Sequence, residues 1–100
     1  MLKHVVAFKL EGQSPDQEAA MLAACRGLMG VIPELKSFSM GRNYSPRDDQ
    51  FTHALVTEFD DLDACMRYVN DPRHVEVVNA HIAPFVKARM IVDYDMEPGR

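Results

Sequence analysis

The chain has no tryptophan, and it has only two cysteines among its 100 residues. Cys25 and Cys65 show no Cys-x-x-Cys spacing and both fall in helical patterns, so neither a disulfide framework nor a structural zinc site is expected. We interpret them as buried, reduced thiols of the core. Long apolar runs are also missing, because none approaches the roughly 20 residues that a membrane-spanning helix needs. The membrane is therefore not an expected partner.

Basic runs and glycine-rich phosphate loops are absent as well. The formal net charge is −4 with both signs mixed along the chain, which does not suit nucleic acid or an anionic membrane surface. Without a phosphate-loop motif no nucleotide is expected, and we predict no cofactor. The first residues run directly into an alternating segment that contains Lys9 and do not resemble a signal peptide. The predicted location is the cytoplasm.

Four segments have the alternation or the boundaries of β-strands. One hundred residues suffice for one core, so residues 1–100 are predicted to form a single domain. Side chains alternate between apolar and polar with a period of two in three segments, and Pro84 precedes a fourth. The predicted strands are residues 2–10, 35–43, 51–59 and 86–95.

Two helices are expected between these strands. Ser14 and Gln17 form a capping box with Pro15 at the first helical position, and this helix should fade between Gly30 and Pro33. The second helix should start at residue 60 or 61, and Asp71-Pro72 should interrupt it before the pattern resumes over residues 73–82. Its predicted buried side includes Leu62, Cys65, Met66 and Val69.

The order β-α-β-β-α-β predicts an α+β fold of the ferredoxin-like, split βαβ type. In this plan the first and third strands lie side by side in the centre of a four-stranded antiparallel sheet, with the helices on one face. The other face would carry an apolar middle made of Val5, Ala7, Ala54 and Val56, with charges near the strand ends. Such a face needs a cover, so we predict a homodimer joined sheet to sheet. The alternative is a monomer with a mildly apolar exposed sheet.

Short motifs along nearly the whole chain point to one family. They are Lys3-His4-Val-Val-Ala-Phe-Lys-Leu, Val31-Ile-Pro-Glu-Leu-Lys, Met40-Gly-Arg-Asn43, Phe51-Thr-His53, Tyr68-Val-Asn-Asp-Pro-Arg-His74, Ile82-Ala-Pro84 and Val92-Asp-Tyr94. In this order they resemble the stress-responsive dimeric α/β-barrel (Dabb) proteins. The resemblance implies a homodimer whose two sheets form a barrel, with the helices outside and a cavity between sheet and helices in each subunit.

The resemblance also implies roles for particular residues. One plant member of the family is a cyclase that closes a linear polyketide by aldol condensation without metal or organic cofactor. Its pocket residues match His4, His53, Tyr68 and His74, with His74 in the place of the base and Tyr68 in the place of its hydrogen-bonding partner. A tyrosine of that enzyme's first helix aligns with Cys25, which removes a hydroxyl and argues against a shared substrate.

The residues themselves support the same candidates. Tyr68 and His74 flank the helix break, and an imidazole that titrates near pH 6.5 can accept a proton at neutral pH. The alternative is that His74 braces the break through a backbone carbonyl. His4 and His53 lie on apolar strand faces, where they either line the pocket or serve as satisfied core histidines. Phe8, Leu55 and Met66 are the predicted apolar lining, and the histidine spacings predict no metal site.

These observations leave three functional hypotheses. The first is a pocket for an apolar or aromatic carbonyl or hydroxyl compound, acting in its catalytic form as a cofactor-free lyase or cyclase with His74 as general base. The second is a non-catalytic, stress-associated dimer with structural histidines. The third and remotest is a monooxygenase of the kind found among other dimeric α/β barrels.

Overall fold

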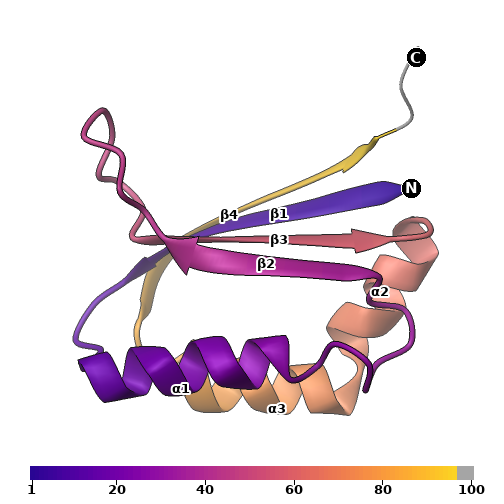
Figure 1. The fold of residues 1–100 in the computed structure, drawn as a ribbon, viewed down its shortest axis with the longest axis horizontal. Helices are drawn as coiled ribbons and strands as arrows, with labels where there is room; N and C mark the ends of the chain where they lie inside the picture. The colour runs from indigo at the N-terminus through magenta and orange to yellow at the C-terminus, as the bar shows by residue number, and fades with distance from the viewer. Residues whose placement is uncertain (97–100) are drawn as a thin grey trace.

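The computed structural model describes residues 1–96 and shows a four-stranded sheet with helices on one side (Figure 1). The elements are β1 (Leu2–Leu10), α1 (Pro15–Arg26), β2 (Ser37–Arg42), β3 (His53–Phe59), α2 (Leu62–Asn70), α3 (Pro72–His81) and β4 (Val86–Asp95). Residues 97–100, part of the predicted domain, lie outside the described residues. None of the helices within residues 1–96 is long and apolar enough to cross a membrane.

The strand order is β2-β3-β1-β4, and every neighbouring pair is antiparallel. The predicted central position of β1 and β3 is therefore confirmed. The register places Val6 opposite Leu55 on one side and Ile91 on the other. The helices contact β1, β2 and β3, whereas β4 contacts chiefly β1. The helix-facing side of β4 is consequently open.

The helix α1 begins as predicted and ends earlier than predicted. The Ser14 hydroxyl accepts a hydrogen bond from the Gln17 backbone N–H at 3.1 Å, and the Gln17 side chain accepts from the Ser14 N–H at 2.9 Å. The predicted end between residues 30 and 33 is wrong, because regular helix stops at Arg26 with Gly27 as the C-cap. Turns with bonds between residues three apart follow, as in a 3₁₀-helix, and the first such bond runs from the Leu28 N–H to the Cys25 carbonyl at 3.2 Å. Glycine favours helix weakly, which accounts for the early end.

The predicted break at Asp71-Pro72 divides two helices. Asp71 is extended (φ −64°, ψ 131°), as expected for a residue before proline, and its carboxylate accepts from the Arg73 backbone N–H at 2.8 Å. Asp61 caps the preceding helix in the same way, accepting from the Ala64 N–H at 2.8 Å. The corner is thus specified locally on both sides, which fixes where the first turn of α3 lies.

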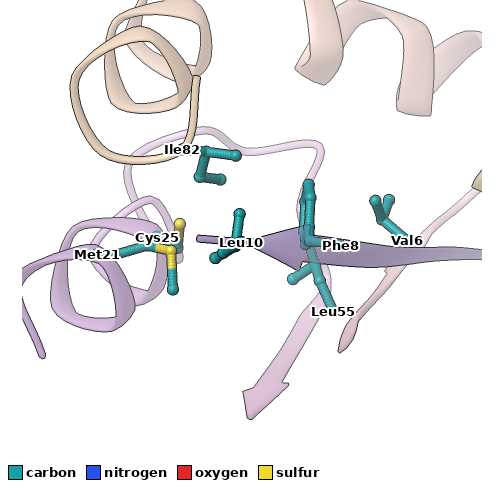
Figure 2. Packing of buried hydrophobic residues seen from close by; sticks show 7 residues of the cluster. All are labelled: Val6, Phe8, Leu10, Met21, Cys25, Leu55 and Ile82. Carbon is teal, nitrogen blue, oxygen red and sulfur yellow. The ribbon is translucent and has the colours of Figure 1, made fainter. Parts of the chain in front are cut away.

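Two apolar clusters fill the space between sheet and helices. Figure 2 shows the first, in which Phe8 and Leu55 of the central strands lie beside each other and Met21 and Cys25 of α1 lie near Ile82. The second joins the residues after α1 to β3 and α2, and consists of Leu28, Ile32, Leu35, Phe59, Ala64, Cys65 and Tyr68. Both cysteines are buried and free, as predicted.

Two residues of α2 do not lie where they were predicted. Leu62 and Met66 were expected on the buried side, but they are 51% and 46% exposed. The buried stripe consists instead of Ala64, Cys65 and Tyr68. Because positions four apart share a helix face, Leu62 and Met66 lie together on the neighbouring stripe, which faces away from the core.

The sheet face away from the helices is apolar and uncovered by any described element. Val5 pairs with Val56 of β3 and with Val92 of β4, so these three side chains share that face. Along β4 the same face continues with Met90 and Tyr94, which are 46% and 47% exposed. The apolar face predicted from β1 and β3 is therefore extended by β4.

Candidate functional site

A cavity of about 100 Å³ lies between the sheet and the helices. The strands supply His4, Phe8 and Leu55 to its lining, and the α2–α3 corner supplies Tyr68 and His74. Five of the seven sequence-predicted site residues therefore surround one space. Most of the remaining lining is aliphatic, which is the usual composition of a small-molecule site.

Tyr68 and His74 face each other across the corner, as predicted. Their ring centroids are 4.5 Å apart, and the ring planes are inclined at 50°. The His74 Nδ1–H donates to the Val69 carbonyl at 2.9 Å, one of the last carbonyls of α2 that has no partner within its own helix. The ring thus braces the corner, and it does so with one nitrogen only.

The other nitrogen, His74 Nε2, is suited to accept a proton. Burial lowers the pKa of His74 below its ordinary value of 6.5, and nearby His4 lowers it further, against the opposing effects of the Val69 carbonyl and Asp71. The imidazole is therefore neutral at pH 7. Because Nδ1 carries the proton given to Val69, Nε2 carries the lone pair, and it bonds no residue within 1–96.

Tyr68 is a hydrogen-bond donor at the same place. Its side chain is 3% exposed, and burial raises the pKa of its hydroxyl, with smaller contributions from Cys25 and Cys65, so it stays protonated. The hydroxyl bonds none of the described residues, yet every fully enclosed polar side-chain atom among them has a partner. The hydroxyl therefore opens onto the cavity. Phe59 supports the ring at a centroid distance of 5.0 Å.

A carboxylate that was not predicted as part of the site joins it from β4. The His4 Nδ1–H donates a hydrogen bond to the Asp93 carboxylate, and the His4 and Phe59 rings meet edge to face with an interplanar angle of 73°. From the sequence alone, Asp93 and Tyr94 in the last strand are interpreted as an edge of the dimer interface. Side chains alternate along β4, so the sequence could have predicted that Asp93 lies on the same, helix-facing side as Ile91. Its pairing with His4, however, depends on the β1–β4 register.

These residues also form the one group in residues 1–96 with the ligand types of a metal site. One donor atom each of His4, Cys65 and Asp93 lies within 4.8 Å of the other two. Burial raises the pKa of the Cys65 thiol to about 11, and the His4 Nδ1 already donates to Asp93. Both features favour hydrogen bonding over metal coordination, since a thiol must lose its proton to bind a metal.

His53 does not join this cavity, contrary to prediction. The β1–β3 register places it opposite Phe8, four residues along the sheet from His4. Its Nε2 lies 2.6 Å from the Glu18 carboxylate and its Nδ1 lies 2.7 Å from the Thr52 hydroxyl, so both nitrogens are engaged. Glu18 also binds Arg42, and the hydrogen bond from Arg42 is the largest of the effects that hold the pKa of Glu18 below 4.5. His53 therefore belongs to a hydrogen-bonded group that links α1 to the sheet through Glu18.

Met66 is the other predicted lining residue that lies elsewhere. It borders an open recess on the outside of α2, together with Asp63, Arg67 and Asn70. Met66 does not line the cavity because it lies on the exposed side of α2, next to the buried stripe of Ala64, Cys65 and Tyr68.

The family model of the stress responsive A/B barrel domain matches residues 2–96, almost all of the described chain. The chain belongs to this family. Two curated relatives show how far the sequence similarity extends. An uncharacterized protein of Streptomyces coelicolor is 34% identical over 74% of this chain and 79% of its own length. The stress-response A/B barrel domain-containing protein HS1 of Arabidopsis thaliana is 27% identical over 93% of this chain and 87% of its own.

Solved structures show a similar chain fold. A dimeric ferredoxin-like protein of unknown function from Thermobifida fusca is 27% identical, with a TM-score of 0.82 and coverage of 95% and 90% of the two chains. A hydroxynitrile lyase from Passiflora edulis is 22% identical, with a TM-score of 0.85 and coverage of 97% and 94%. An antibiotic biosynthesis monooxygenase, at 16% identity and a TM-score of 0.68, covers 98% and 100%. The last two likenesses concern the fold alone.

Proposed function

We propose that the cavity binds a small apolar or aromatic compound bearing a carbonyl or hydroxyl group, and that His74 acts there as a general base. The observation that carries the proposal is the pairing of two unlike groups at an apolar cavity. His74 Nε2 offers a lone pair, and the Tyr68 hydroxyl offers a proton. A ligand oxygen and an acidic hydrogen on the same compound would satisfy both groups.

The chemistry that suits this pair is proton transfer next to a carbonyl. His74 Nε2 would remove a proton from the α-carbon or hydroxyl of the ligand, and Tyr68 would donate a hydrogen bond to the oxygen that becomes negative. A resulting enolate can attack a second carbonyl to close a carbon–carbon bond. Removal of a hydroxyl proton instead allows such a bond to break. Either course is a cofactor-free cyclase or lyase reaction, in which the proton on His74 returns to the product.

The size of the cavity limits the enclosed part of the ligand. A cavity of about 150 Å³ lined by aliphatic and aromatic side chains accommodates benzene. The space of about 100 Å³ here is smaller, so it encloses part of one ring or a short branched chain, and the remainder of the ligand lies at the opening. Acetophenone, with one ring and one carbonyl, is a suitable first probe.

We further propose that the protein works as a cytoplasmic homodimer joined through the sheet face of Val5, Val56 and Val92. That face is apolar, and no described element covers it. The Thermobifida fusca relative is described as dimeric, which supports the same assembly. The metal-free and cofactor-free character of the site is part of the proposal.

Two substitutions of His74 distinguish its proposed role as a general base from its structural hydrogen bond to the Val69 carbonyl. Asparagine retains an N–H that can donate to the Val69 carbonyl but has no basic nitrogen, whereas alanine has neither. We expect His74→Asn to fold as stably as the natural protein and to lose base-catalysed exchange of the acetophenone methyl hydrogens in deuterated water, followed by NMR. His74→Ala should lose exchange and also about 1 kcal/mol of stability. Exchange that persists unchanged in His74→Asn would refute the role as base.

The non-catalytic dimer remains the second candidate, because the bond from His74 to Val69 is of the kind that a purely structural histidine makes. It predicts that natural protein and His74→Asn bind no acetophenone and differ from His74→Ala only in stability. For a monooxygenase, the solved structure supplies similarity of fold alone, at 16% identity.

A further inference from the structure

Arg89 of β4 lines the cavity, although the adjacent lining is aliphatic. It pairs with Phe8 in the β1–β4 register, so its side chain starts from the helix-facing side of the sheet. Histidines aside, it is the single ionisable lining residue that carries a charge at pH 7, because the one carboxylate of the site, Asp93, is bonded to His4 and is not part of the cavity lining. A lone cation at the opening of an apolar space attracts an anionic group.

Three other arginines form ion pairs with carboxylates. Arg42 binds Glu18, Arg67 binds Glu34 at 3.2 Å, and Arg73 binds Asp71 at 2.7 Å. Within residues 1–96, Arg89 makes no ion pair or hydrogen bond. Its five N–H donors are therefore available to a ligand in the geometry that suits a carboxylate.

We propose that the ligand of this cavity is a small carboxylic acid whose carboxylate binds Arg89. The inference rests on the proposed function, since it concerns the same cavity. The apolar group of the ligand occupies the space beside Phe8 and Leu55. The carbonyl or hydroxyl group lies toward His74 and Tyr68. The ligand class is thus an aromatic or branched aliphatic acid that carries an additional oxygen function.

The positions of the two polar ends agree with such a ligand. Arg89 is four residues along β4 from Asp93, the partner of His4, which corresponds to roughly 13 Å between backbone positions. Arg89 comes to the cavity from β4, whereas Tyr68 and His74 come from the α2–α3 corner, so the guanidinium and the catalytic pair belong to different elements of the lining.

Benzoate and acetophenone form a matched pair of probes, because they have the same number of heavy atoms and differ in charge. We expect benzoate to bind the natural protein more tightly than acetophenone does, by isothermal titration calorimetry at low salt. Arg89→Gln should weaken benzoate binding about tenfold or more and leave acetophenone binding unchanged. Arg26→Gln is the control, because Arg26 is an exposed arginine of α1 outside the cavity lining.

The possible results separate the two proposals. If acetophenone binds and benzoate binds no more tightly, or if Arg89→Gln leaves benzoate affinity unchanged, the carboxylate assignment fails and the proposed pocket stands. If neither compound binds the natural protein, both proposals fail. An equal loss of benzoate affinity in Arg26→Gln would show a general charge effect and would also overturn the assignment. Melting temperatures confirm that each variant is folded.

Discussion

His74 divides its two nitrogens between structure and chemistry. Nδ1 holds the end of α2 through Val69, and Nε2 faces a space that also contains the Tyr68 hydroxyl. The structural bond assists the chemical role, because it selects the tautomer whose Nε2 can accept a proton. Substitutions at these residues should therefore show separable effects on stability and on ligand chemistry.

The pH dependence of stability tests the buried state of His74. Its pKa is lowered in the folded protein from the ordinary 6.5, so the unfolded chain takes up this proton first as the pH falls. The free energy of unfolding should then decrease on acidification below about pH 6.5 relative to His74→Asn, which has no such proton. Urea unfolding of both proteins across this range measures the difference. A natural protein that keeps or gains stability relative to His74→Asn on acidification would contradict the burial of a neutral imidazole.

Tyr68→Phe tests whether the hydroxyl belongs to the fold or to the ligand. The hydroxyl bonds no described residue, so its removal should change the free energy of unfolding by less than about 1 kcal/mol. Acetophenone affinity should fall about two- to tenfold through loss of one hydrogen bond. A thermal melt and a calorimetric titration of the same sample give both values. A large loss of stability with unchanged affinity would assign the hydroxyl to the fold.

At this scale the sequence predicted the residues that depend on local order and failed for those that depend on register. Tyr68 and His74 are six positions apart around a proline break, so their proximity follows from local structure. Asp93 was missed and His53 was placed in the wrong site, because both assignments require knowing which residues of neighbouring strands are opposite each other. Strand register depends on long-range packing that one strand does not reveal.

Among the elements, α1 is tied to the sheet by Glu18. This carboxylate accepts from Arg42 of β2 and lies 2.6 Å from His53 of β3. Glu18→Gln should reduce the free energy of unfolding by about 1–2 kcal/mol at pH 7, because the ionised carboxylate is lost and buried His53 keeps a poorer partner. Chemical denaturation measures this loss. Glu11→Gln, whose ion pair with Lys9 is exposed, is the control and should have little effect.

Because the pKa of Glu18 is lowered from 4.5, its stabilising effect should be complete above that pH and disappear as the pH falls through the lower folded value. The natural protein and Glu18→Gln should therefore converge in stability in acid. A difference that stays constant down to the acid limit would show that the carboxylate charge is not what ties α1 to the sheet.

The element order and most boundaries followed from alternation, capping residues and prolines. The last strand, Val86–Asp95, lies where it was predicted, as does the capping box of α1. The end of α1 did not, because apolar residues continue at helical spacing through Leu28 and Ile32 after regular helix has stopped. Periodicity marks burial, and burial persists through the tighter turns that follow Gly27.

For the whole molecule, the uncovered sheet face predicts self-association. A charge at Val92, which is 46% exposed on that face, should dissociate the dimer, because a glutamate there would be buried without a partner. We expect Val92→Glu to sediment as a monomer in analytical ultracentrifugation. Val31→Glu is the matched control, since Val31 is 47% exposed in the connection after α1 and should leave the dimer intact. A natural protein that sediments as a monomer at micromolar concentration would refute the proposed assembly.

The most direct test of the cavity as a ligand site is NMR of the histidine ring nitrogens during titration with acetophenone. The natural protein should show His74 in the neutral form protonated on Nδ1, and its Nε2 resonance should shift as the ligand binds while that of His81, outside the cavity lining, stays in place. If the ligand leaves the His74 resonances unchanged, or if His74 is protonated on both nitrogens at pH 7, the cavity is not the site proposed here.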